Sequence, residues 1–238
     1  MTDMYVALDL ETTGLQPKTD RILEIGAIKV VDGKIEDVYH TLIDPRMKIP
    51  AHITQITGIT EEMVAGQKEN EQAIRELLNF CEDLPLLGHN ILFDYSFVKC
   101  SAVNLKLVFE KDGLDTLKIA RCMLPELASR SLQYLREYYK IPQDKAHRAL
   151  DDAHTTHLLY QKLKMAFGEA RPDLFCPAAL QYKAKRQSPI TNAQKGYLQD
   201  LVKYHKISLN VEIESMTKSE ASRMIDTLLS TYGRISKR

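Results

Sequence analysis

The stretch at residues 21–43 reads RILEIGAIKVVDGKIEDVYHTLI and sets the fold class. Its first half is rich in β-branched residues and ends at Asp32-Gly33, a pair that favours a two-residue hairpin turn of type I′. The second half is therefore expected to return as an antiparallel strand. Upstream, residues 5–10 form a short apolar run that ends in the turn signal Thr-Thr-Gly, as a buried strand would. The chain is predicted to begin with three strands.

Strand and helix patterns alternate after this hairpin. Apolar residues in 70–81 recur at the 3, 4, 7, 8 spacing of an amphipathic helix. Further short strands are expected at 84–87 and 113–119, and further helices at 91–104, 131–139 and 149–167. Hairpin strands followed by alternating strands and helices indicate an α/β protein with a mixed sheet covered on both faces.

The domain organisation follows from composition. Residues 1–170 are expected to form one domain, and 171–189, which holds three prolines, a linker. Residues 190–238 are expected to form a small helical module, in which two helices open with capping boxes, Thr191-x-x-Gln194 and Thr217-x-x-Glu220.

The charge of the chain is unevenly distributed. The formal net charge is +0, with 32 Lys+Arg against 32 Asp+Glu. Residues 183–238 hold 11 of the cations and 5 of the acids, which is +6, so the remainder carries −6. Such asymmetry hints at nucleic-acid contact by the basic part. The alternative is a helical segment whose lysines are simply solvated, and charge alone favours that alternative.

Several classes of protein are excluded by composition. No run of about 18 apolar residues exists, so no transmembrane helix is expected. The first residues resemble no secretory signal. Four cysteines stand far apart without a Cys-x-x-Cys pair, which favours reduced thiols and a cytoplasmic location over a disulfide framework or a zinc site.

Two acids stand at the end of the first predicted strand. Asp9 and Glu11 are two residues apart, so their side chains project from the same face. Burying paired negative charges is costly unless a cation neutralises them. Mg²⁺ or Mn²⁺, which prefer carboxylate oxygens, would serve. The alternative is an exposed strand end with two solvated acids.

Two further clusters hold candidate groups. Asp94 falls in the first turn of the helix after the fourth strand and can point toward the strand ends, or can simply complement the helix dipole. His147 stands five residues before Asp152, about 140° away on a regular helix. The two can converge only if His147 precedes the helix or sits in its frayed first turn. Spacing does not decide between Asp151 and Asp152.

Together these clusters resemble a known family. The stretches DLETTGL at 9–15, HNILFD at 89–94 and HRALDDA at 147–153 resemble the three motifs of the DEDDh (DnaQ-like) 3′–5′ exonuclease superfamily. That superfamily includes the proofreading epsilon subunit of bacterial DNA polymerase III. Supporting matches are ILEIGA at 22–27, ITGIT at 56–60 and DTLKIAR at 115–121. Thr57 departs from the pattern, because proofreading subunits often carry His there.

The resemblance implies a fold, a reaction and a site. The fold would be ribonuclease H-like, with a five-stranded mixed sheet flanked by helices. The reaction would be 3′→5′ hydrolysis of nucleic acid to nucleoside 5′-monophosphates, aided by two Mg²⁺ or Mn²⁺ ions. Asp9, Glu11, Asp94 and Asp152 match the metal-binding carboxylates and His147 matches the general base, whereas Asp151 has no role in the family.

Substrate contacts and partners are also expected. The residues proposed to hold the 3′-terminal nucleotide are Thr12, Thr13, Gly14, Leu15, Asn90 and Phe93. For Leu15 and Phe93, core packing is the alternative role. The expected substrates are 3′ ends, most simply of single-stranded DNA, with RNA as the alternative. A DNA polymerase or another replication or repair protein is a candidate partner through residues 171–238, and no membrane is expected.

Overall fold

The computed structural model describes residues 3–142 and 147–235, and the chain divides into two compact units. Unit 1 comprises residues 1–44 and 49–184, and unit 2 comprises 45–48 and 185–238. The boundaries expected from composition, 1–170, 171–189 and 190–238, stay a prediction, and residues 236–238 of the expected module lie outside the described part of the chain.

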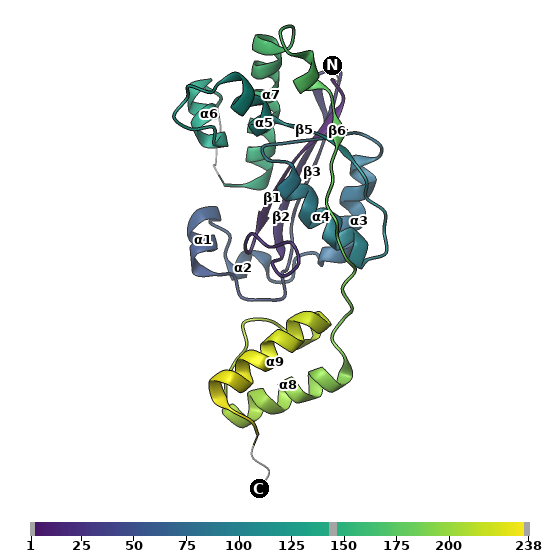
Figure 1. The fold of residues 1–238 in the computed structure, drawn as a ribbon, viewed down its shortest axis with the longest axis vertical. Helices are drawn as coiled ribbons and strands as arrows, with labels where there is room; N and C mark the ends of the chain where they lie inside the picture. The colour runs from purple at the N-terminus through teal and green to yellow at the C-terminus, as the bar shows by residue number, and fades with distance from the viewer. Residues whose placement is uncertain (1–2, 143–146, 236–238) are drawn as a thin grey trace. The chain divides into compact units, whose positions relative to one another are not determined.

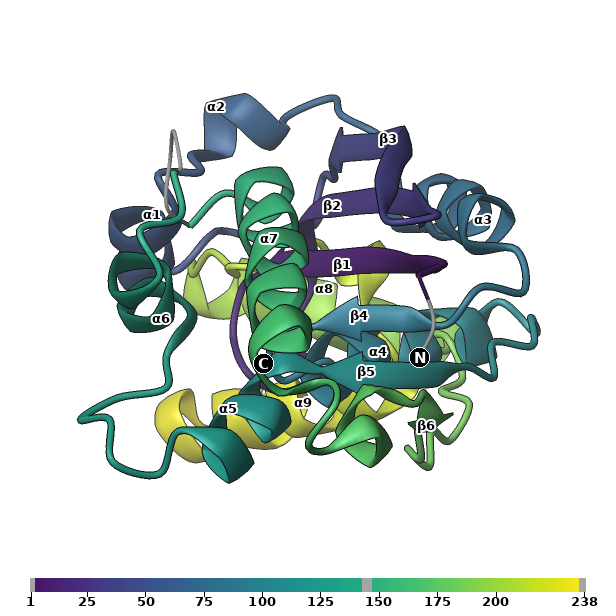
Figure 2. The same cartoon turned by 90° about the horizontal axis from the view of Figure 1, so that it is seen from above.

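Unit 1 is built on one mixed sheet in the order β3-β2-β1-β4-β5-β6, whose strands lie in a row in Figure 2. The first three strands form antiparallel pairs, and β4 and β5 continue the sheet in parallel with β1. The strands are β1 Tyr5–Thr12, β2 Ile22–Val31, β3 Lys34–Leu42, β4 Leu86–Gly88, β5 Asp112–Asp115 and β6 Ala178–Ala179. The α/β mixed sheet is confirmed, and its first three strands follow the predicted hairpin order.

The sheet carries one strand beyond the expected five. The two-residue strand β6 pairs antiparallel with β5 and extends the edge. It lies inside residues 171–189, the segment expected to be a linker, together with the 3-10 helix η1 Pro172–Phe175. A strand this short carries no periodicity that a sequence pattern can detect.

The strand expected at 113–119 is only half correct. The strand ends at Asp115, and α5 begins at the next residue. The Asp115 side chain accepts hydrogen bonds from the backbone N–H groups of Leu117 and Lys118, which caps the helix and ends the strand.

Helices flank the sheet of unit 1 (Figure 1). They are α1 Ala51–Thr57, α2 Glu61–Val64, α3 Asn70–Cys81, α4 Leu92–Asn104, α5 Thr116–Met123, α6 Leu132–Tyr138 and α7 Ala149–Phe167. Alternate side chains of β1 pack into two separate hydrophobic cores. Val6 and Leu8 join the cluster that holds residues of α3 and α4, whereas Tyr5 and Ala7 join the cluster that holds residues of α5 and α7. Because Asp9 continues the second alternation, it faces the α7 side.

Unit 2 is formed by α8 Asn192–His205 and α9 Lys218–Tyr232, with the short 3-10 helix η2 Ile213–Ser215 between them. Both predicted capping boxes are present, at Thr191 and Thr217. The core of the unit is small and apolar, and its buried members are Ile190, Leu198, Leu201, Met216, Ala221 and Leu228. Residues 46–48 contribute an antiparallel pairing with 210–212 within this unit, since Met47 pairs with Val211.

No helix in the described part of the chain is both long enough and apolar enough to cross a bilayer.

Candidate active site

The end of β1 supplies two of the predicted acids. Asp9 and Glu11 stand on the same face of the strand, and Glu11 is half-buried. Burial raises the pKa of Asp9 well above its usual range, and the negative charges of Asp94, Asp152 and Glu11 raise it further. Burial also raises the pKa of Glu11 to about 8, with Asp152 as the next contributor. Burial and the neighbouring negative charges thus disfavour the charged form of both carboxyl groups, and a bound cation would oppose this effect.

The start of α4 brings the third acid to the same place. Asp94 is 4% exposed, and its Oδ1 accepts a hydrogen bond of 3.0 Å from the backbone N–H of Leu10. This bond ties the first turn of α4 to the end of β1, between the two acids of that strand. Burial raises the pKa of Asp94, against hydrogen bonds from backbone N–H groups that lower it. Its environment is thus that of a site acid and not of a solvated helix start.

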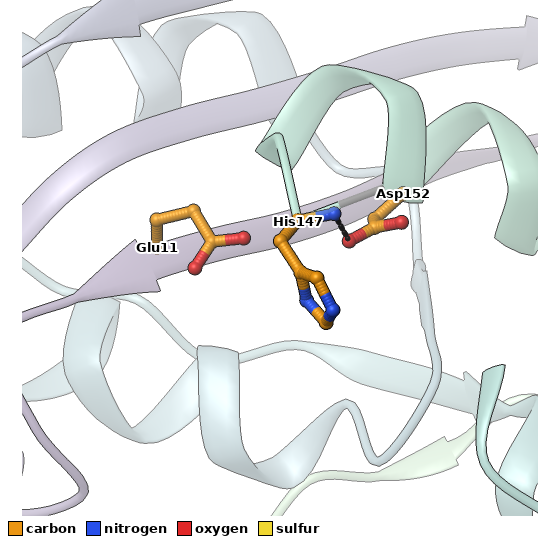
Figure 3. Close-up of side chains that lie close together, drawn as sticks. All are labelled: Glu11, His147 and Asp152. Carbon is orange, nitrogen blue, oxygen red and sulfur yellow. Dashed lines mark hydrogen bonds between the residues drawn. The ribbon is translucent and has the colours of Figure 1, made fainter. Parts of the chain in front are cut away.

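The start of α7 supplies the remaining two groups. His147 precedes the helix by two residues and has a left-handed φ of 59°, while Asp152 lies in the first turn. This is the arrangement that the five-residue spacing required. The backbone N–H of His147 donates to Asp152 Oδ2 at 3.2 Å. Ligand atoms of Glu11, His147 and Asp152 all lie within 4.8 Å of one another, and Figure 3 shows Glu11 reaching from β1 toward the other two.

A buried ion pair that sequence reasoning missed holds this helix start. Glu24 on β2 is fully buried, and Nε and Nη2 of Arg148 donate to its carboxylate at 2.6–3.1 Å. His40 Nε2 donates to Glu24 at 2.7 Å, and the backbone N–H of Ala149 does so at 3.1 Å. Burial would raise the pKa of Glu24, but these hydrogen bonds outweigh it and lower the pKa to about 2.

The contact between β2 and α7 also depends on a glycine. A Cβ at Gly26 would overlap backbone atoms of Ala149 and Leu150. Only glycine permits this close approach. Arg148 follows His147 directly, so the Glu24 ion pair and Gly26 together fix where His147 and Asp152 lie. The sequence did carry one signal, a charged residue inside the apolar run at 22–28, but nothing local identified its partner.

The predicted substrate contacts lie mostly in the loop after β1. Thr12 and Thr13 are buried, with the Thr12 hydroxyl donating to Gly14 O at 2.7 Å and the Thr13 hydroxyl accepting from Arg21 N–H at 2.9 Å. Both hydroxyl groups therefore brace the loop. Leu15 is 76% exposed, which removes core packing as its role.

The other two predicted contacts follow β4, Asn90 in the turn after the strand and Phe93 in the first turn of α4. Asn90 is exposed with a φ of 72°, and its N–H donates to Asp115 Oδ1 at 3.0 Å. Phe93 packs against Phe97 at 5.1 Å between ring centroids and touches the core, so packing accounts for much of its surface. Beside Asn90 lies an open groove of about 680 Å³, whose lining includes Arg121 and Arg130.

The donor set fits a divalent cation. Carboxylate oxygens are the ligands that Mg²⁺ and Mn²⁺ prefer. Burial and neighbouring negative charges raise the pKa values of Asp9, Glu11 and Asp94. Among the neighbours that shift these pKa values, the one cation is Arg148, which lowers the pKa of Glu11. A bound cation would remove that repulsion.

Comparison with known proteins agrees with this geometry. The exonuclease family model, RNase T, matches residues 6–160. This span contains Asp9, Glu11, Asp94, His147 and Asp152, which we call the acid cluster. The chain belongs to this exonuclease family, within the DEDDh (DnaQ-like) superfamily.

Among the curated relatives are bacterial DNA polymerases. The DNA polymerase III PolC-type of Clostridium perfringens is 35% identical over 172 residues, which cover 72% of this chain and 12% of the relative. That of Thermotoga petrophila is 42% identical over 153 residues, which cover 64% of this chain and 11% of the relative. The chain thus matches only about a ninth of the length of these relatives.

Solved exonuclease structures share the fold. Exonuclease X in complex with 5′ overhanging duplex DNA superposes with a TM-score of 0.55 at 28% identity, over 69% of this chain and 93% of that one. Escherichia coli Exonuclease I in complex with a dT13 oligonucleotide gives a TM-score of 0.65 at 18% identity, over 73% of this chain and 44% of that one. At this identity the similarity supports the fold alone. The ribonuclease H-like fold is confirmed.

Proposed function

We propose that this chain removes nucleotides from the 3′ end of nucleic acid, most simply single-stranded DNA, and releases nucleoside 5′-monophosphates. The observation that carries the proposal is the convergence of Asp9, Glu11, Asp94, Asp152 and His147 from three separate segments of one exonuclease fold. The DNA named for the solved structure of Exonuclease X supports DNA as the substrate.

The four carboxylates Asp9, Glu11, Asp94 and Asp152 would hold two Mg²⁺ or Mn²⁺ ions, and the negative charges of the other three act on Asp9. When bound, such a pair neutralises charge on the scissile phosphate and stabilises both the attacking and leaving oxygens. The protein's own part is to hold the carboxylate oxygens that bind the metal in fixed positions. Asp94 is held by Leu10 N–H and Asp152 by the His147 backbone, so neither carboxylate has to reorganise.

His147 would take the proton of the attacking water. Its imidazole is exposed and carried by a residue outside the helix, so the ring can face the water beside Glu11 and Asp152. Histidine is the side chain most often used for such proton transfers.

Replacing His147 with alanine should lower kcat by about 10²- to 10⁴-fold, the usual contribution of a general base. Binding of Mg²⁺ and of a 3′-terminal oligonucleotide should stay close to wild type, because the carboxylates remain. His154→Ala, which removes an imidazole of α7 that lies outside the cluster, is the matched control and should retain activity. An H147A enzyme with wild-type kcat would exclude the general-base role.

The exposed loop after β1 would hold the terminal nucleotide. At Gly14 a Cβ would overlap the Asp20 carboxylate, so glycine lets this loop pack against Asp20, and the exposed Leu15 would offer apolar surface to the terminal base. Asn90 would contact the same nucleic-acid strand, since the groove that Asn90 lines also holds Arg121 and Arg130, which could contact phosphates. Thr12 and Thr13 act mainly by bracing the loop, and Phe93 by supporting the start of α4.

Divalent metal should stabilise the fold more at high pH than at low pH. In the metal-free chain the pKa of Glu11 is raised from 4.5 to about 8, so the folded state binds more protons than the unfolded state, and stability falls as pH rises between these values. Mg²⁺ at 100 times its Kd adds about 2.7 kcal/mol. The Tm increase on adding Mg²⁺ should therefore be larger at pH 8.5 than at pH 5.5.

Thermal unfolding with and without Mg²⁺ at the two pH values measures this effect. The Asp94→Asn variant should lose most of the Mg²⁺-dependent shift, and Asp151→Asn should keep it. A shift that is equal at both pH values would show that protons and metal do not compete for these carboxylates.

The main alternative is an exoribonuclease, since the acid cluster acts on a phosphodiester of either sugar and discrimination rests on contacts around the 2′-hydroxyl. Initial rates on single-stranded DNA, mismatched primer-template, RNA and dinucleotides of equal concentration decide between them. Preference for RNA or for dinucleotides would replace the DNA assignment.

A polymerase-associated role is the second candidate. The segment that this chain matches belongs to chains named DNA polymerase III PolC-type, which supports a DNA polymerase as partner. Residues 171–238 remain the expected docking segment for such a polymerase or another replication or repair protein. A cytoplasmic location likewise stays a prediction.

A further inference from the structure

Three aromatic rings meet where α8 and α9 end. The ring centroids of Tyr204 and His205 are 4.9 Å apart at 86°, and those of His205 and Tyr232 are 5.5 Å apart at 33°. His205 Nε2 donates to Gly233 O at 3.2 Å, which holds the two helix ends together. We call these three residues, with the cations described next, the tyrosine surface of unit 2.

Core packing does not account for the two tyrosines. Tyr204 is 47% exposed and Tyr232 is 50% exposed, whereas Leu201 and Leu228, which lie one turn earlier on the same helices, are buried in the core of unit 2. Both aromatic rings are thus presented to solvent on a rigid pair of helix ends.

Three cations stand close to these rings in the sequence. Lys203 and Lys206 flank Tyr204 and His205 in the sequence, and Arg234 follows Tyr232 by two residues; all three are exposed. In the part of the chain that the structure describes, none of the three forms an ion pair. The nearest acids along the helices, Asp200 and Asp226, lie a turn or more before the rings. Favourable placement at helix C-termini explains part of this charge but not the exposed rings beside it.

We propose that the tyrosine surface binds single-stranded nucleic acid, with bases stacked on Tyr204 and Tyr232 and phosphates held by Lys203, Lys206 and Arg234. Stacking platforms interleaved with cations are the means by which proteins hold single strands without sequence preference. A duplex hides its base faces, so it would gain only the phosphate contacts. The inference rests on the proposed function, and it gives the exonuclease a second contact with its substrate outside the acid cluster.

The test measures binding in a chain that does not hydrolyse its ligand. In the full-length Asp152→Asn background, fluorescence anisotropy gives the Kd for labelled dT20, U20 and a blunt 20-base-pair duplex over a range of salt concentrations. Removing both rings, Tyr204→Ala with Tyr232→Ala, should weaken dT20 binding at least tenfold, since one stacking ring contributes about 5- to 150-fold. Tyr204→Phe with Tyr232→Phe retains both rings and should bind within about twofold of the parent.

The lysines are tested separately. Lys203→Gln with Lys206→Gln should lower the salt slope for dT20 by about 1.4, which is two phosphate contacts on a single strand. These changes lie on the surface, so they decide the question even if the alanine pair unfolds unit 2, which far-UV circular dichroism would reveal. Comparing the Kd values for dT20 and U20 shows whether binding distinguishes DNA from RNA.

Unchanged dT20 affinity in a folded alanine pair, an unchanged salt slope in the glutamine pair, or equal affinity for the blunt duplex would each overturn the inference. The first two results would assign the surface to a protein partner. Failure here is separable from failure of the proposed function, because wild-type hydrolysis of a saturating tetranucleotide tests the acid cluster without requiring the tyrosine surface.

Discussion

Asp152→Asn should reduce the rate of nucleotide release by at least about 10³-fold, with little change in thermal stability. The reason is that Asp152 brings a carboxylate to within reach of Glu11 and His147, and an amide neither carries that charge nor binds a divalent cation as well. Charge stabilisation by a metal contributes several kcal/mol, and each 1.36 kcal/mol is tenfold in rate. Single-turnover hydrolysis of end-labelled single-stranded DNA measures it.

The neighbouring residue provides a matched control. Asp151 carries the same charge in the same first turn of α7, but only Asp152 lies in the cluster with Glu11 and His147. Asp151→Asn should therefore stay within about twofold of the wild-type rate. Equal losses in the two variants would point to the helix dipole or to net charge, and full activity of D152N would remove Asp152 from the metal ligands.

Glu24→Ala should lower the free energy of unfolding by about 3–5 kcal/mol, the cost of removing one partner of a buried ion pair. The buried carboxylate accepts hydrogen bonds from the partly exposed Arg148 guanidinium, the exposed His40 ring and the buried Ala149 N–H. Its loss therefore removes the anion that pairs with Arg148 and leaves the Ala149 N–H without its acceptor. Lowering the pKa of Glu24 from 4.5 to about 2 corresponds to about 3 kcal/mol of stabilisation of its charged form, which agrees with this range. Urea unfolding at pH 7 measures the loss.

The pH dependence follows from the same shift. The folded-state pKa of Glu24 lies below the unfolded value, so its contribution is present above about pH 4.5 and is lost as pH falls toward about 2. The stability difference between wild type and E24A should shrink over that window. Glu71→Ala, which removes an exposed pair with Arg75 on α3, should cost only about 0.3–0.5 kcal/mol. Similar losses in both variants would contradict a structural role for the buried pair.

The Glu24 variant should also lose activity beyond its loss of stability. Arg148 stands next to His147, and Ala149 begins α7, so releasing this segment displaces both His147 and Asp152. A displacement of about 1 Å can cost about 10²-fold in rate. Assays at a temperature where E24A is fully folded separate this effect from unfolding.

What the sequence predicts well is what local patterns encode. The hairpin of β2 and β3 is visible because its turn residues and β-branched strands are contiguous, and the capping boxes of α8 and α9 are visible for the same reason. The five candidate site residues can be proposed from the sequence because they stand inside three short motifs. Their convergence required only that β1, α4 and α7 begin or end at one edge of the sheet.

What the sequence does not predict depends on contacts between distant segments. Glu24 and Arg148 are 124 residues apart, and neither residue type alone indicates the pair. The requirement for Gly26 becomes visible only when the backbone of α7 lies against β2. Spacing alone leaves Asp151 and Asp152 open, and the family resemblance points to Asp152. In the structure His147 precedes α7 with a left-handed φ, and Asp152 lies beside it and Glu11. The aromatic contact between His205 and Tyr232 likewise joins two helices that the sequence treats separately.

The central claim, a metal-dependent 3′→5′ exonuclease centred on these five residues, is tested most directly by the products formed from one strand labelled in turn at each end. With Mg²⁺, a 5′-labelled single-stranded DNA should shorten in single-nucleotide steps, a 3′-labelled strand should release its label at once as a mononucleotide, and EDTA should abolish both. Shortening of the 3′-labelled strand from the other end, internal cuts, or undiminished hydrolysis in EDTA would contradict the account.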